Sequence, residues 1–140
     1  MPTNTPGSTA REFHGLQLVH TLRFTVNYND AGIASGVGKQ VLPAGAIIIG
    51  TDVVVETVFN AGTTNVLTVG TNAASYNNIV AAADVNEAAV AITKDISPTG
   101  TALGPLAADV QVFAMYAQTG APATTGKADV IIKYVPNNDL

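Results

Sequence analysis

The two histidines, His14 and His20, are the side chains of this chain best suited to metal binding or general-base catalysis. His20 falls on the apolar face of an alternating segment, where a hydrogen-bonded core imidazole is commoner than a metal ligand. His14 precedes that segment, and neither histidine has an Asp or Glu at a recognised spacing. We therefore predict no metal ligand and no catalytic base at either position.

A second candidate is the carboxylate pair Asp52 and Glu56, which share parity in a predicted strand and so point to one face. At a rise of about 3.3 Å per residue, the two side chains lie about 13 Å apart, too far for a glycosidase pair. We predict that both carboxylates lie on the side of the strand that faces solvent or an interface. The residues expected to point inward are Val53, Val55, Thr57 and Phe59.

Asp84, Asn86 and Glu87 could supply oxygen ligands to Ca²⁺. The segment lacks the repeated acidic positions and the terminal glutamate of a calcium-binding loop. We therefore predict a polar loop without a metal.

Two further motifs fall short of catalysis. Gly36-Val37-Gly38-Lys39 lacks the spacing of a phosphate-binding loop, and no helix is predicted after it, so it predicts a turn. The sequence contains no Gly-x-Ser-x-Gly nucleophile elbow, and no serine has a His or Asp neighbour in sequence that suggests activation. The serines are Ser8, Ser35, Ser75 and Ser97. We predict no enzyme, no cofactor and no metal; a triad assembled in space from distant residues would overturn this.

The composition favours assembly over ligand chemistry. The chain is 47% hydrophobic and only 11% charged, so little charge keeps copies apart and uncharged surface is available for a partner. A net charge of −4 and six scattered basic residues argue against nucleic acid. The N-terminus lacks a secretory pattern, and the apolar runs are too short to span a bilayer. We expect a protein made in a cytoplasm, with no membrane and no nucleic-acid partner.

The elements that must position these residues are short strands. Strict apolar alternation over 16–28 predicts a half-buried strand, and 43–71 predicts two strands joined as a hairpin through Asn60-Ala61-Gly62. We expect 36–45 to be loop-like and 79–91 to be a loop with short strand character. Two more strands are predicted at 109–117 and 127–135.

About eight short strands punctuated by Gly and Pro predict an all-β jelly-roll or β-sandwich. We expect an extended arm at 1–12, a single domain at 13–135 and a tail at 136–140. The predicted core comprises Leu18, Leu22, Phe24, Val26, Val53, Val55, Phe59, Leu67, Val69, Val112, Val130, Ile132 and Tyr134. Low charge and the outward-facing Val54, Val58 and Ile131 predict self-association, as a homodimer or alternatively a trimer.

One set of segments carries a family resemblance: Leu42-Pro43-Ala44-Gly45-Ala46, 51–55, 59–71, Gly104-Pro105-Leu106 and 126–130. Over 16–135 this pattern resembles small head proteins of tailed phages, and more narrowly the capsid cement or decoration proteins of podophages. The resemblance implies a jelly-roll protein on the outer surface of the icosahedral head, clamping neighbouring major capsid subunits. It transfers no individual contact residue.

Two other classes remain open. A head-binding or tail-fibre module would share the Thr/Asn/Gly-rich, Cys-free β style, normally within a longer chain. A carbohydrate-binding β-sandwich is the third reading, weakened by the absence of Trp and an aromatic content of only 6%.

Overall fold

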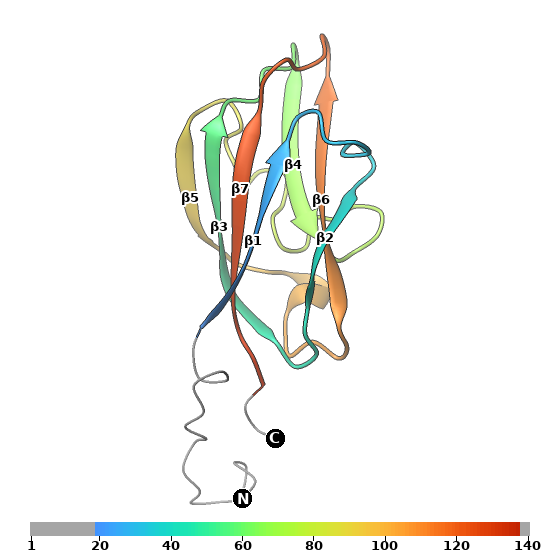
Figure 1. Cartoon of the computed structure of the whole chain (residues 1–140), viewed down its shortest axis with the longest axis vertical. Coiled ribbons are helices and arrows are strands. Elements are labelled where there is room, and N and C mark those ends of the chain that lie inside the picture. The colour runs from blue at the N-terminus through green and yellow to red at the C-terminus, as the bar shows by residue number, and fades with distance from the viewer. Residues whose placement is uncertain (1–18, 138–140) are drawn as a thin grey trace, which may run out of the picture.

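The computed structural model describes residues 19–137 and contains two antiparallel sheets packed face to face (Figure 1). The larger sheet, in spatial order, contains β1 (His20–Asn27), β7 (Lys127–Val135), β3 (Ile47–Thr57) and β5 (Ala91–Ile96). The smaller contains β2 (Val37–Leu42), β6 (Val110–Thr119) and β4 (Thr64–Gly70), and a 3₁₀ turn, η1 (Gly100–Ala102), lies before β6. Seven described strands confirm the predicted all-β sandwich or jelly-roll class.

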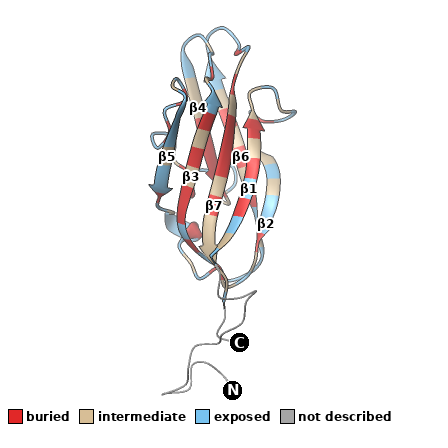
Figure 2. Cartoon of the chain, turned by 60° about the vertical axis from the view of Figure 1, so that its left-hand side comes forward, coloured by how far each residue is buried: buried red, intermediate tan, exposed pale blue. Residues whose placement is uncertain are grey.

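The core lies between the sheets and is built from the alternating apolar positions of their strands (Figure 2). Tyr134 is half-buried and packs against it. The other predicted core positions within 19–137 are buried: Leu22, Phe24, Val26, Val53, Val55, Phe59, Leu67, Val69, Val112, Val130 and Ile132. Alternation therefore identified the buried face correctly. Leu18, His14, Ser8, the arm expected at 1–12 and the last three residues of the expected tail lie outside the described residues.

Strand β3 changes its inward-facing parity through irregular pairing with β7. Its register shifts between Ile48 and Gly50, so Ile48 faces inward before the shift and Val53 and Val55 face inward after it. A second shift between Val55 and Thr57 leaves Thr57 exposed. Between these two pairs, β3 has one residue more than β7, and this extra residue reverses the alternation. The prediction that Thr57 points inward is therefore wrong.

The predicted hairpin across 43–71 is also wrong, although both of its strands exist. β3 belongs to the larger sheet and β4 to the smaller, so the connection crosses the sandwich. Phe59 lies in this connection, buried, with its ring centroid 4.7 Å from that of Tyr116 on β6. Burying this aromatic ring between the sheets favours a crossing over a tight turn.

One strand occupies a segment where the sequence predicts a loop, and another begins at the end of the segment 79–91. β2 replaces the turn predicted at 36–39 and most of the loop predicted at 36–45; Gly36, at φ +100°, makes the bend just before it. β5 begins only at Ala91, while Val80 forms a single bridge with Val69, consistent with the short strand character expected at 79–91. Pairing with β6 and β3 stabilises segments whose own strand propensity is low.

Candidate functional site

His20 lies at the start of β1. It is half-buried, opposite Tyr134 in the ladder, with the two ring centroids 5.6 Å apart. It therefore borders the core, where the sequence placed it inside. Within residues 19–137, no three His, Asp or Glu side chains gather closely enough to hold a metal ion.

The outer face of the larger sheet carries a set of ion pairs. Lys127 Nζ lies 3.1 Å from a Glu56 carboxylate oxygen. Lys133 Nζ lies 3.3 Å from Asp52 Oδ1 and 2.9 Å from Asp95 Oδ1. Asp52 and Glu56 thus face outward as predicted, but each is neutralised by a different lysine. They do not converge on a common substrate position.

Asp129 is the buried member of this outer face. Its carboxylate accepts hydrogen bonds of 2.7 Å from Arg23 and 2.7 Å from Thr25 on β1. Burial by itself would raise the pKa of Asp129, but these hydrogen bonds and the Arg23 charge outweigh it and hold the pKa below its ordinary value. The arrangement stabilises an anion that joins β7 to β1 and leaves no free base.

Glu87 departs most from its predicted surroundings. It is buried, where the sequence predicts a polar loop, and its Oε1 accepts a 2.8 Å hydrogen bond from the Leu67 backbone N–H. Its own carbonyl accepts from Phe59 N at 2.9 Å. Burial raises the pKa of the Glu87 carboxyl, and backbone hydrogen bonds only partly oppose the rise. The Glu87 carboxylate thus covers the Leu67 N–H on the free edge of β4, beside the bridge from Val80 to Val69.

The free edge of β1 is closed by side chains from β2. Lys39 Nζ donates to the Thr25 carbonyl at 3.0 Å, and Gln40 Nε2 donates to the Arg23 carbonyl at 2.9 Å. Lys39 is therefore a structural cation and not part of a phosphate-binding loop. Together with Glu87, these residues satisfy backbone groups that would otherwise template pairing with another chain.

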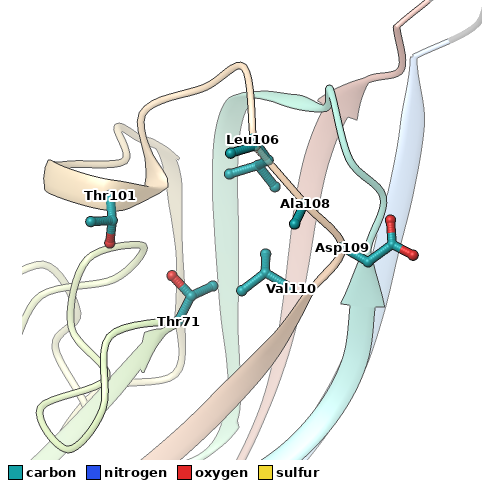
Figure 3. A pocket seen from close by; sticks show the side chains of 7 residues that line it. Thr71, Thr101, Leu106, Ala108, Asp109 and Val110 are labelled. Carbon is teal, nitrogen blue, oxygen red and sulfur yellow. The ribbon is translucent and has the colours of Figure 1, made fainter.

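A hollow of about 260 Å³ lies between the segment after β4 and the one before β6 (Figure 3). The hydroxyls of Thr71 and Thr101 already accept hydrogen bonds from Asn78 Nδ2, at 2.9 and 3.0 Å. The carboxylate of Asp109 points away from these threonines in Figure 3 and accepts from Ala44 N at 2.8 Å. These polar groups of the hollow are thus hydrogen-bonded within the fold.

The described serines, Ser35, Ser75 and Ser97, are exposed.

Exposed apolar side chains form the other notable feature of the surface. We define the lower end as residue 19, the β2–β3 turn at 43–46, the β5–β6 connection at 97–109 and residues 136–137, with the strand ends that adjoin them (Figure 1). The exposed large apolar residues there are Val19, Val41, Ile47, Ile49 and Leu103; Val90 and Ile92 lie at the start of β5. Sequence analysis missed this cluster, whose signal was the uncharged run 103–108 beside the uncharged turn 43–46.

No helix among residues 19–137 is long and apolar enough to cross a membrane. Among residues 19–137, the edges, ion pairs and hollow described above do not bring a catalytic set of side chains together.

No protein-family model and no curated protein matches the sequence. Two solved structures contain similar chains. A chain in the capsid asymmetric unit of cyanophage Pam1 is 22% identical, with a TM-score of 0.60, across 96% of this chain and 98% of that one. A chain in the capsid of Ralstonia phage GP4 is 19% identical, with a TM-score of 0.55, across 87% and 86%. At these identities, the comparisons establish that the β-sandwich is shared with chains of two phage capsid structures.

Proposed function

We propose that this protein is a structural component of a tailed-phage virion, a cement or decoration protein bound to the outside of the icosahedral head. The observation that carries the proposal is the nearly end-to-end likeness to a chain of the cyanophage Pam1 capsid asymmetric unit. The resemblance of the sequence pattern to podophage head proteins points the same way. In this role the protein clamps neighbouring major capsid subunits.

The described surface supports a structural role. The free edges of β1 and β4 are closed by Lys39, Gln40 and Glu87, so those backbone groups are not left open for unspecific strand pairing. On the larger sheet, Lys127 is paired with Glu56, and Lys133 with Asp52 and Asp95. Such a body presents a defined shape with few free charges, which suits repeated contacts on a symmetric shell.

Self-association remains a prediction beside the capsid contact. Val54, Val58 and Ile131 are half-buried in the single chain, leaving part of each side chain available. A stable homodimer would bury about 800 Å² per partner. Sedimentation of the free protein as a dimer at micromolar concentration supports the prediction; a trimer selects the alternative assembly, and a monomer contradicts self-association in solution.

The functional test compares complete heads with heads made without this protein. A ligand that prefers the intact shell stabilises it by mass action, so deficient heads should release DNA at a lower temperature or milder osmotic shock. Adding purified protein back should restore resistance. Equal robustness of both particle types contradicts the cement role, and recovery of the protein only with tails would favour the head-binding or tail-fibre module.

A further inference from the structure

The sandwich differs in polarity between its two ends. At the end opposite the lower end, Asn60 Nδ2 donates to Thr124 Oγ1 at 2.8 Å, and the Thr64 and Thr119 hydroxyls lie 2.6 Å apart. Two of the seven exposed large apolar side chains within 19–137, Val90 and Ile92, lie toward that end, and none belongs to its connections at 58–63 and 120–126. The lower end holds most of them.

The apolar residues of the lower end form a connected surface. Ile47 pairs with Val135 across β3 and β7, and Val19 precedes His20, whose ladder partner is Tyr134. Val19, Val135 and Ile47 therefore follow one cross-strand row on the outer face. The β5–β6 connection packs against this row, because a Cβ added at Gly104 would lie 3.0 Å from Ile47 Cα. That contact places Gly104, which follows the exposed Leu103 in the chain, against Ile47.

An uncharged groove of about 660 Å³ adjoins this row. Its lining contains no ionisable side chain and comprises Pro43, Ala44, Gly45, Pro105, Leu106, Ala107, Pro136 and Asn137. One charged group among the described residues borders it, Asp109, whose carboxylate accepts a hydrogen bond from Ala44 N. A surface of this kind is complementary to apolar protein surface and not to a charged ligand.

Both ends of the described chain lie here, at residues 19 and 137 (Figure 1). Residues 1–18 and 138–140 therefore begin from the lower end, and 18 residues span at most about 60 Å when fully extended. If these segments contact the partner on which the lower end docks, they would enlarge the same interface. Two copies meeting through this end would instead crowd both pairs of segments at one interface.

We propose that the lower end is the docking surface for the capsid shell, seated on an uncharged apolar patch of a major capsid subunit. This inference rests on the proposed cement function and adds the orientation: the lower end faces the shell, and the polar end faces outward. Val19, Ile47, Ile49 and Leu103 lose water on docking, and the Lys127–Glu56 ion pair, toward the other end of the same outer face, remains accessible.

The test uses full-length protein, heads that lack it, and single charge substitutions at exposed sites. Leu103→Glu and Ile47→Glu place a carboxylate in the proposed contact, where desolvation without a partner should weaken binding about tenfold or more. Val90→Glu is the matched control, because Val90 is also apolar and exposed but lies at the start of β5. It should bind like wild type. Circular dichroism and thermal melts confirm that each variant is folded.

The possible outcomes separate the orientation from the function. If wild type fails to bind the deficient heads, the cement function is contradicted. If wild type binds and both lower-end variants bind equally well, the function stands and the proposed orientation is wrong. Lower-end variants that keep shell binding but turn a wild-type dimer into a monomer would assign the surface to a second copy, overturning the proposal. Salt screens attraction between charges, so a large loss of binding at high salt concentration would contradict an apolar contact.

Discussion

The buried carboxylate of Glu87 provides a quantitative test of how the sandwich is held together. Glu87→Ala removes the acceptor of the Leu67 N–H, which lies on a fully buried residue. A buried donor left without a partner costs about 1–3 kcal/mol. For a domain of this size, 1 kcal/mol corresponds to about 3 °C in melting temperature. We therefore expect Glu87→Ala to lower the melting temperature by about 3–9 °C.

Glu87→Gln separates the hydrogen bond from the charge. Glutamine keeps an oxygen acceptor for Leu67 N but carries no ionisable group. Because burial raises the pKa of Glu87, the native state holds its proton to higher pH than the unfolded chain does. The stability that this proton linkage supplies is fully present below the unfolded pKa and is lost as pH rises through the raised pKa.

The stability of wild type relative to Glu87→Gln should consequently decrease as pH rises from about 4 through the raised pKa of Glu87. Urea unfolding or thermal melts across this pH range measure the difference, and Asp84→Asn, an exposed carboxylate in the same connection, serves as the control. If Glu87→Gln loses as much stability at pH 7 as Glu87→Ala, the ionised carboxylate is itself stabilising and the desolvation argument is wrong.

Three other predictions concern the core, the outer face and the N-terminus. Phe59→Ala should cost about 3–5 kcal/mol in urea unfolding, because the ring fills the space between the sheets; a loss below about 1 kcal/mol would contradict that packing. Asp129→Asn should destabilise the protein at neutral pH, and the deficit should shrink as pH falls through the lowered pKa of Asp129; a constant deficit in pH-dependent melts would refute the linkage. Deleting residues 1–10, which belong to the expected arm, should weaken binding to deficient heads far more than it lowers the melting temperature, and equal loss of both would contradict an arm role.

The strands with strong local signals could be predicted from sequence. Alternation around Leu22, Phe24 and Val26 identifies the buried face of β1, because each position needs only an apolar side chain at a spacing of two. β2 and β5 lack this pattern: Gly38 and Lys39 lie in one, and Lys94 and Asp95 in the other. Their formation depends on strands distant in sequence, which a local pattern does not encode.

Two features depend on the assembled sandwich: which strands pair with each other, and which polar side chains are buried. The residues of β3 and β4 predict two adjacent strands, but nothing local specifies that they lie in opposite sheets. Thr57 turns outward because of a register shift with β7, which is a property of the pair. Glu87 is buried because its acceptor meets Leu67 N, and a lone glutamate in a polar segment gives no sign of that contact. The lower end likewise emerges only when 43–46, 103–108 and the chain ends are brought together.

The most direct test of the cement role is the amount of this protein on mature heads separated from tails. Quantitative mass spectrometry of purified heads measures its copy number relative to the major capsid protein. The proposed function predicts a fixed ratio from one preparation to the next, because binding sites on a symmetric shell are set by its subunits. Absence of the protein from mature heads, or a ratio that falls toward zero on further purification, would contradict it.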